Sequence, residues 1–358
     1  MTAKERVLSA INRERLDRIP CDYWGTQEIT NKLKKYFGVK EDLTLWKKLG
    51  IDKIINLTPL PPWSASHCYI GPPLADNEDI WRVKYKPKSY ADGSGVYQEM
   101  CYNPLADLNT IEEVEANYTF PKADWFDFST IEEECRKYPE NAIECGYAAP
   151  FFMYNNIRGL EKSLMDLAAN KEYTHYVIDR ICDFLYSFHE RLFEAGNGLI
   201  DQAEVTDDFG TQSGLMISTE MFDEFFKTHF QRLIKLVKDF GIKVFHHDDG
   251  AIRPIIPKMV ELGIDILNPI QWRLPGMDPK GLKKDFGEVL CFHGGVDNQK
   301  TLPFGNAKDV EKEVIYLLET LASNKTGYIL APCHNIQPIT PVENIIAMYE
   351  TVHHYGVL

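Results

Sequence analysis

The feature that most constrains the fold is a repeated order of helix, glycine and strand in the second half of the chain. Helical periodicity ends at Gly241, at Gly263 and at Gly287, and a short apolar run typical of a buried strand follows each glycine. Strands that alternate with helices pair in parallel, because each helix carries the chain back along the sheet. The order therefore predicts an α/β protein built on a parallel sheet.

Apolar runs of strand length occur about eight times, which is the number that closes a (β/α)8 TIM-type barrel. They lie at residues 21–23, 51–57, 142–147, 199–204, 242–245, 264–268, 289–293 and 328–330. An open, doubly wound sheet is the alternative, but neither a GxGxxG nor a GxxxxGK[ST] motif supports a nucleotide-binding version of it. We predict a single barrel domain over residues 1–358 with a helical region at its N-terminus.

Residues 58–120 depart from this rhythm. Repeated prolines break any long helix in this segment. Residues 80–85 and 96–102 alternate between apolar and polar side chains on either side of the glycine-containing stretch 91–95, which predicts a small β-hairpin. We expect this segment to be an excursion from the barrel that lies near its mouth.

Composition excludes several classes of function. The chain has 53 acidic and 39 basic residues, for a net charge of -14, which argues against a nucleic-acid surface. No apolar run is long enough to cross a membrane. The eight cysteines form no CxxC pair and the N-terminus carries no apolar signal segment, which predicts reduced thiols and a cytoplasmic protein. The classes of function that remain are small-molecule chemistry and binding of a protein partner.

Residues that can bind a metal ion occur at the predicted strand ends, where barrels of this type carry their active sites. His247 and Asp249 follow one strand, and side chains two residues apart in an extended segment point the same way. Cys333 follows the last strand. The pattern predicts a zinc site made of His247, Asp249 and Cys333, with Glu204 as the alternative fourth ligand. The competing interpretation is that Asp249 caps a helix and Cys333 is a buried thiol.

Three further residues are candidates for catalysis. Asp207 and Asp208 could act as a general acid, as a substrate clamp or as partners of the metal-binding histidine. His334 is the third candidate, although it could merely hydrogen-bond the turn before the last helix. Candidates for substrate contact share a position near the predicted mouth: Tyr23, Trp24, Tyr147, Gln212, His246, Trp272, His293 and Asn335. Any aromatic residue among them could equally be an ordinary core residue.

Four stretches together resemble the uroporphyrinogen decarboxylase superfamily, in its cobalamin-dependent methyltransferase branch. They are residues 5–20, with Glu5-Arg6-Val7-Leu8 and Leu16-Asp17-Arg18-Ile19-Pro20, then Asp207-Asp208-Phe209-Gly210, His247-Asp248-Asp249-Gly250, and residues 333–348 from Cys333-His334-Asn335 to Ala347-Met348. The resemblance implies a (β/α)8 barrel. True uroporphyrinogen decarboxylases carry an arginine-rich loop near the N-terminus, whereas residues 21–26 contain no arginine here. A true uroporphyrinogen decarboxylase is therefore not expected.

The resemblance also implies a zinc site and a reaction. Thiol-methylating members bind zinc through a His-x-Cys pair and a distant Cys, and the positions matched to these are His247, Asp249 and Cys333. A carboxylate in place of a thiolate suits a substrate that bears oxygen. The expected enzyme is an O-demethylase-type methyltransferase, which passes a methyl group from a small methoxy compound, such as a methoxyarene, to the Co(I) corrinoid (cobalamin) of a separate protein.

Several alternatives stay open at the level of the sequence. One is a methylcobalamin:thiol methyltransferase, a second is a decarboxylase-like lyase of a small acid, and a third is a barrel that binds a ligand without catalysis. The sequence contains no Asp-x-His-x-x-Gly motif for a corrinoid of its own, so the corrinoid is expected on a partner protein. The direction of transfer and the oligomeric state are open, and a homodimer is compatible with the sequence.

Overall fold

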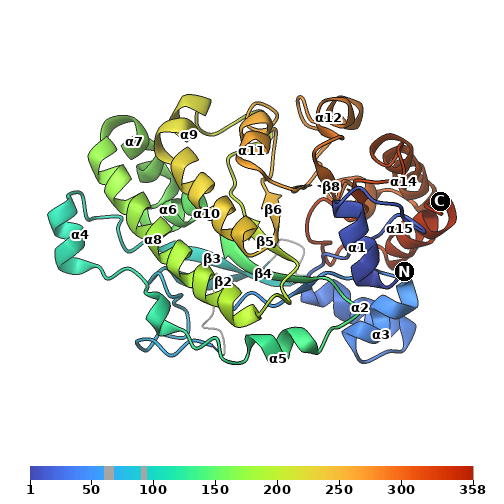
Figure 1. Cartoon of the computed structure of the whole chain (residues 1–358), viewed down its shortest axis with the longest axis horizontal. Coiled ribbons are helices and arrows are strands. Elements are labelled where there is room, and N and C mark those ends of the chain that lie inside the picture. The colour runs from blue at the N-terminus through green and yellow to red at the C-terminus, as the bar shows by residue number, and fades with distance from the viewer. Residues whose placement is uncertain (60–67, 90–94, 358) are drawn as a thin grey trace.

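A parallel, curled sheet forms the centre of the molecule (Figure 1). The computed structural model describes residues 1–59, 68–89 and 95–357. The sheet order is β1-β4-β5-β6-β7-β8-β9, and neighbouring strands pair in parallel. The strands are β1 (Ile55–Asn56), β4 (Ile143–Ala148), β5 (Gln202–Val205), β6 (Lys243–His247), β7 (Ile266–Asn268), β8 (Cys291–His293) and β9 (Tyr328–Ile329). The prediction of an α/β TIM-type fold is confirmed.

The eighth predicted strand, at residues 21–23, is present as a single bridge that joins the two edges of the sheet. The Leu330 N–H donates to the carbonyl of Pro20 at 3.0 Å, and the Asp22 N–H donates to the carbonyl of Leu330 at 2.9 Å. On the other side the Asp52 N–H donates to the carbonyl of Cys21 at 2.8 Å. Pro20 has no N–H to donate, which limits how far pairing can extend in this segment.

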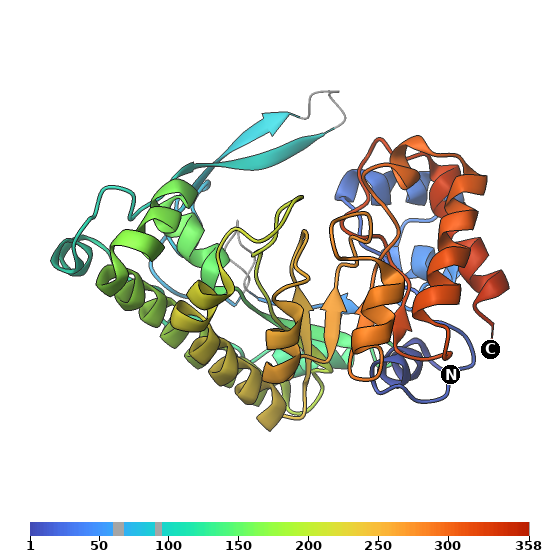
Figure 2. The same cartoon turned by 90° about the horizontal axis from the view of Figure 1, so that it is seen from above.

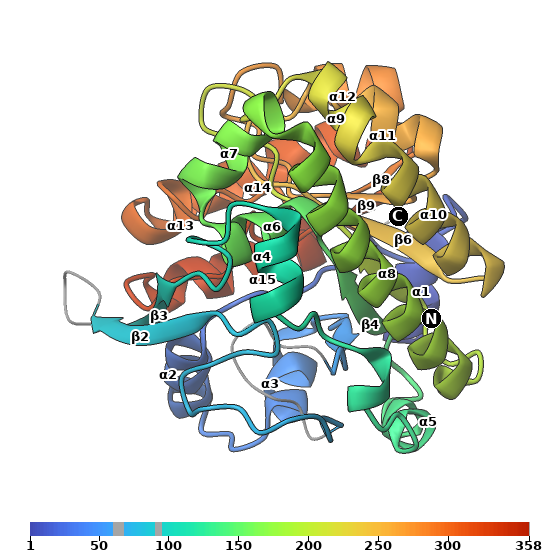
Figure 3. The same ribbon diagram turned by 90° about the vertical axis from the view of Figure 1, so that its left-hand side faces the viewer.

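A helix or group of helices follows each strand from β4 onward and returns the chain along the outside of the sheet (Figures 1 and 3). They are α6 (Pro150–Arg158), α7 (Leu160–Ala169), α8 (Lys171–Gly196), α9 (Thr219–Phe225), α10 (Lys227–Asp239), α11 (Ile256–Leu262), α12 (Pro279–Phe286), α13 (Thr301–Phe304), α14 (Ala307–Leu321) and α15 (Val342–Tyr355). Apolar side chains on their inner faces pack against the strands, which form the hydrophobic core.

The remaining elements precede β4. They are α1 (Ala3–Ile11), α2 (Gln27–Phe37), α3 (Asp42–Leu49), β2 (Lys84–Ser89), β3 (Val96–Tyr102), α4 (Ile111–Asn117), the 3-10 helix η1 (Ala123–Trp125) and α5 (Ile131–Arg136). The helical periodicity over residues 29–49 belongs to two helices, because Gly38 adopts a left-handed conformation with φ +66° and ends α2.

The predicted hairpin is confirmed as the antiparallel pair β2–β3, which projects away from the rest of the molecule (Figure 2). The second strand has the predicted bounds, 96–102, whereas the first begins at Lys84 and not at residue 80. Most of the predicted turn, residues 90–94, and the proline-rich residues 60–67 lie outside the described residues. Among the described residues, no helix combines the length and apolar character needed to span a membrane. All eight cysteines lie in the described ranges, and none of them is joined in a disulfide there.

Candidate metal centre

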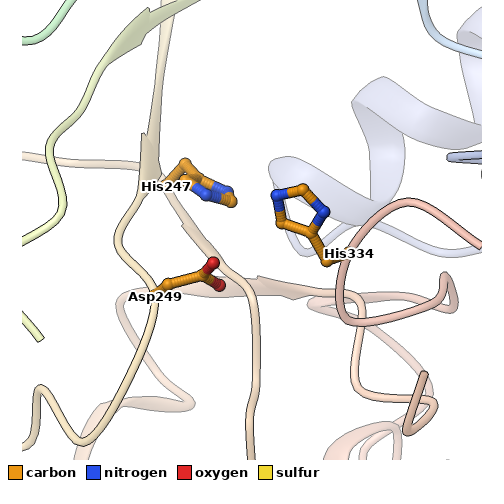
Figure 4. Close-up of side chains that lie close together, drawn as sticks. All are labelled: His247, Asp249 and His334. Carbon is orange, nitrogen blue, oxygen red and sulfur yellow. The ribbon is translucent and has the colours of Figure 1, made fainter. Parts of the chain in front are cut away.

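Three side chains that can bind a metal ion converge at the carboxyl end of the sheet: His247, Asp249 and His334 (Figure 4). One ligand atom from each lies within 4.8 Å of the ligand atoms of the other two. His247 is the last residue of β6, and Asp249 follows two residues later on the same side of the extended chain. His334 comes from the loop after β9, and the curvature of the sheet brings this loop across to β6.

Asn268 at the end of β7 fixes the orientation of His247. The parallel register pairs the two residues, and Nδ1 of His247 lies 2.6 Å from Oδ1 of Asn268. Because an amide oxygen can only accept, Nδ1 carries the ring proton. The lone pair of Nε2 is therefore free, and this nitrogen lies 3.9 Å from Oδ1 of Asp208. Such a partner on the far ring nitrogen is what holds a histidine ready for a metal ion.

The hydrogen-bond chain continues from Asn268 through the barrel interior. The amide of Asn268 donates from Nδ2 to Nδ1 of His293 at 2.8 Å, and Nε2 of His293 lies 3.3 Å from Oδ2 of Asp22. Lys53 donates to the other oxygen of Asp22 at 3.2 Å. Burial raises the pKa of Asp22, but the Lys53 ammonium and the His293 hydrogen bond outweigh burial and bring this pKa down to about 2. An ionised carboxylate thus anchors the chain.

The other two members of the cluster are also held by neighbours. Nε2 of Gln271 donates to Oδ1 of Asp249 at 3.0 Å. The backbone N–H of Asn335 donates to Nδ1 of His334 at 2.8 Å, which places the proton of the neutral ring on Nε2. Binding of a cation at Nε2 requires that this proton move to Nδ1 and that the contact with Asn335 be released. Burial lowers the pKa of His334, which favours the neutral ring that a metal ion needs.

The indole of Trp24 lies against both histidines of the cluster. It stacks on His247 with 5.8 Å between ring centroids and 25° between planes, and it meets His334 edge-on at 6.3 Å. Nε1 of Trp24 donates to Oδ2 of Asp22 at 3.0 Å, which fixes the indole. The cluster therefore has a rigid aromatic wall on one side.

The donor set fits a divalent metal ion of the zinc or iron class. Two imidazoles and one carboxylate form the protein ligands of many catalytic zinc sites, and they leave a further position for a substrate. The same set occurs in iron(II) enzymes. The observation that supports this fit is the convergence of three half-buried side chains, two of which, His247 and Asp249, are oriented by partners outside the cluster.

Cys333, which the sequence predicts as a ligand, does not join the cluster. Its Sγ donates to the carbonyl of Ile270 at 3.3 Å, and its side chain is buried. Burial raises the pKa of the thiol well above its usual value, so the thiolate that binds metals is disfavoured. His334, the next residue along the loop, lies at the third corner of the cluster instead.

The two candidate carboxylates of the loop after β5 differ in position. Asp207 is buried, and its two oxygens accept from the backbone N–H groups of Phe151 at 2.8 Å and Phe152 at 2.6 Å. It therefore caps the first turn of α6, and the prediction of a catalytic role for Asp207 is corrected on this point. Asp208 is the accessible one, with 42% of its side chain exposed beside His247.

Glu204 lies apart from the cluster of His247, Asp249 and His334. It lies next to Glu144 of β4 and so does not supply a fourth ligand in this arrangement. Both glutamates line a cavity of about 510 Å³ at the barrel mouth. Three of the predicted substrate-contact residues also line it: Tyr23, Trp24 and Asn335. Gln212 and Trp272 line a second cavity of about 140 Å³, together with Cys333. Tyr147 is half-buried, and its phenol lies near Glu204.

Two predicted substrate-contact residues are corrected to interior positions. His246 is fully buried on the outer side of β6, where Nδ1 lies 2.8 Å from the carbonyl of Val205 and the ring packs against Phe230. Burial lowers the pKa of His246 to about 4, so the ring is neutral. His293 is also fully buried and serves as the link between Asn268 and Asp22.

Asn268 is a polar residue at a predicted strand end, and this position marks it in the sequence as a candidate for the site. The sequence did not single out four other residues that shape the site: Asp22, Lys53, Glu144 and Gln271. Glu144 lies in the middle of an apolar run, and a buried carboxylate in a strand is a signal that could have marked it.

Comparisons with known proteins agree with this fold. Residues 131–355 match the sequence profile of the family described as Uroporphyrinogen decarboxylase (URO-D). A protein named uroporphyrinogen decarboxylase from Anaeromyxobacter sp. (strain Fw109-5) is 24% identical over 166 residues, which are 46% of this chain and 40% of that protein. The chain thus matches about two fifths of the length of this relative.

Two solved structures are similar over nearly the whole chain. A methyltransferase from Methanosarcina mazei superposes with a TM-score of 0.68 at 18% identity and 99% coverage of both chains. A B12-independent methionine synthase from Shewanella sp. W3-18-1, in complex with selenomethionine, gives a TM-score of 0.52 at 11% identity, with 95% of this chain and 97% of that chain covered. At these identities the likeness is one of fold.

Proposed function

The chain belongs to the uroporphyrinogen decarboxylase family, and we propose that it is a zinc-dependent methyltransferase of the O-demethylase type. It transfers a methyl group from a small methoxy compound to the Co(I) corrinoid of a separate protein. The observation that carries this proposal is the convergence of His247, Asp249 and His334 at the barrel mouth. The structural likeness to a methyltransferase from Methanosarcina mazei adds support.

The donor types favour an oxygen-bearing substrate. His247, Asp249 and His334 offer nitrogen and oxygen ligands, whereas two thiolates would favour a zinc-bound thiolate nucleophile. Zinc, when bound, would supply Lewis-acid polarisation of the ether oxygen. The chain of Asn268, His293 and Asp22 keeps His247 oriented for this task.

In the proposed reaction the methyl carbon leaves the ether oxygen, and the electron pair of the broken C–O bond stays on that oxygen. The Co(I) centre of the partner protein contributes the electron pair of the new bond to the methyl group. Asp208, which is accessible beside His247, is placed to pass a proton from solvent to the departing oxygen. Trp24 excludes water from one side of the cluster.

Decarboxylation of a porphyrinogen is disfavoured on electrostatic grounds. The cavity at the barrel mouth is lined by Asp22, Asp42, Glu144 and Glu204, and Lys53 is its basic residue within the part of the chain that the structure describes. A substrate with several carboxylates would be repelled there. The lack of disulfides among the eight cysteines of the described ranges is compatible with the reducing, cytoplasmic setting that a Co(I) partner needs.

The test is methyl transfer from a panel of methoxy compounds to a purified Co(I) corrinoid protein. The absorbance change of the corrinoid reports the transfer. We expect transfer that requires one equivalent of zinc and that is lost in His247→Ala. Lack of transfer from every methoxy compound tested, with zinc bound, would overturn the proposal.

A further inference from the structure

The larger cavity at the barrel mouth is a candidate for the part of the substrate that does not react. It has a volume of about 510 Å³ and lies beside the metal cluster, because Trp24 both lines the cavity and stacks on His247. Asn335, the neighbour of His334, lines it as well. A molecule held in this cavity could therefore present a methyl group to the cluster.

The charge of this cavity is unbalanced. Its carboxylates are those of Asp22, Asp42, Glu144 and Glu204. Asp22 is paired with Lys53 at 3.2 Å, and Asp42 is paired with Lys34 at 2.7 Å. Neither Glu144 nor Glu204 has an ion pair with a basic residue in the described ranges. The two glutamates thus form an uncompensated acidic pair deep in the cavity.

The two glutamates differ in how they are held. Glu144 accepts from Nδ2 of Asn56 and from Nε2 of Gln202, both at 2.7 Å, so its carboxylate is fixed. Glu204 is 9% exposed, and its hydrogen-bond partner is the carboxyl group of Glu144. The side-chain carbonyl oxygen of Gln202, which is buried and belongs to the cavity lining, lacks a donor within residues 1–59, 68–89 and 95–357. A buried acceptor without a donor is costly, so this site calls for a ligand that supplies one.

Burial raises the pKa of Glu144 and of Glu204, and the charge of Glu144 raises the pKa of Glu204 further. In the absence of a ligand a shared proton therefore relieves the repulsion between the two carboxyl groups. A cation can take the place of that proton, and it would also gain from the aromatic faces of Trp24 and Trp46 in the cavity wall.

We propose that this cavity selects substrates that carry a cationic amino group, which binds between Glu144 and Glu204 while the methyl group faces the metal cluster. The inference rests on the proposed methyl transfer for the identity of the reacting end. It adds the chemical class of the other end: an ammonium group, not a neutral hydroxyl and not a carboxylate.

The test uses three ligands of the same shape and different charge: 4-methoxybenzylamine, 4-methoxybenzyl alcohol and 4-methoxybenzoate. Binding to the zinc-loaded chain of residues 1–358 is measured by calorimetry near neutral pH, where the amine is protonated. We expect the amine to bind about tenfold or more tightly than the alcohol, because a hydrogen bond between charged groups is roughly twice as strong as one between neutral groups. The benzoate should not bind measurably.

Two variants test whether Glu204 causes the preference for the amine over the alcohol. Glu204→Gln should bring the affinity for the amine down to that for the alcohol, whereas Glu319→Gln, at an exposed position on α14, should change neither. Melting curves check that both variants fold. If Glu204→Gln fails to fold, the comparison of the three ligands on the unaltered protein still tests the selectivity.

The outcomes separate this inference from the proposed reaction. Equal binding of amine and alcohol, or tighter binding of the benzoate, would overturn the cationic selectivity even if methyl transfer from neutral ethers occurs. Preference for the amine without any methyl transfer would uphold the selectivity and remove the proposed reaction.

Discussion

His247 and Asn268 are joined by a hydrogen bond of 2.6 Å between Nδ1 and Oδ1 across two neighbouring strands. This contact decides which ring nitrogen of His247 carries the proton and therefore which one can bind a metal ion. It also connects the metal cluster to the ionised Asp22 through His293. The orientation of His247 is thus set by residues that lie outside the cluster of His247, Asp249 and His334.

The first prediction concerns this contact. Asn268→Ala should weaken zinc binding by about 10–100-fold, because the His247 ring loses the acceptor that fixes its tautomer. Asn268→Asp keeps an acceptor for His247 and loses only the amide that donates to His293, so its zinc affinity should stay within a few-fold of the unaltered chain. Competition with a chromogenic chelator measures both. Unchanged affinity in Asn268→Ala would contradict the assigned role.

The second prediction distinguishes the two adjacent candidates for the third ligand. His334→Ala should lose stoichiometric zinc, because it removes one of three convergent ligands. Cys333→Ser should retain zinc, since its Sγ donates to the carbonyl of Ile270 and lies outside the cluster. Zinc content after gel filtration gives the answer. Loss of zinc in Cys333→Ser with retention in His334→Ala would restore the thiol as the ligand.

The sequence allowed much of this fold to be predicted, because it repeats one simple unit. Glycines such as Gly241 and Gly263 end helices just before apolar strands, and this local signal does not depend on distant contacts. The approach of His247 and Asp249 was also predictable, since it follows from the alternation of side chains along one strand. Each of these predictions used the sequence of a single segment and no information on which segments lie side by side.

Relations between segments were harder to predict. Asn268 faces His247 because of the register between β6 and β7, and the sequence does not state that register. The choice between Cys333 and His334 failed for a related reason. Regular pairing in β9 ends at Ile329, so no strand alternation defines which of these two adjacent side chains faces the metal cluster. The acidic pair of Glu144 and Glu204 likewise depends on two strands side by side.

The third prediction separates Asp207 from Asp208. Asp207→Ala should lower the free energy of unfolding by about 1–2 kcal/mol, because two backbone N–H groups at the start of α6 lose their acceptor. Asp208→Asn should leave the free energy of unfolding nearly unchanged and lower kcat by about 10²–10⁴-fold, as expected for loss of a proton-transfer group. Denaturant titration measures the free energy of unfolding, and the corrinoid methylation assay measures kcat. Full activity in Asp208→Asn would exclude a role of Asp208 in proton transfer to the departing oxygen.

The fourth prediction is a dependence of stability on pH that Glu204 causes. Burial and the neighbouring Glu144 raise the pKa of Glu204 well above its usual value, so the folded state keeps a proton that the unfolded chain releases above about pH 4.3. The stabilisation from this proton is complete below that pH and is lost as pH rises through the folded-state pKa. Between about pH 5 and pH 8 the unaltered chain should therefore lose stability more steeply than Glu204→Gln.

Other buried carboxyl groups with raised pKa values, such as Asp207 and Asp248, are present in both proteins, so the difference between the two curves reports on Glu204 and its partner Glu144. Melting temperatures across this pH range provide the measurement. The Gln variant should melt higher than the unaltered chain at the upper end by roughly 2–4 °C for each kcal/mol recovered. Glu319→Gln serves as the control and should follow the unaltered chain. Parallel curves for Glu204→Gln and the unaltered chain would show that Glu204 ionises normally and would remove the acidic pair as a binding site for cations.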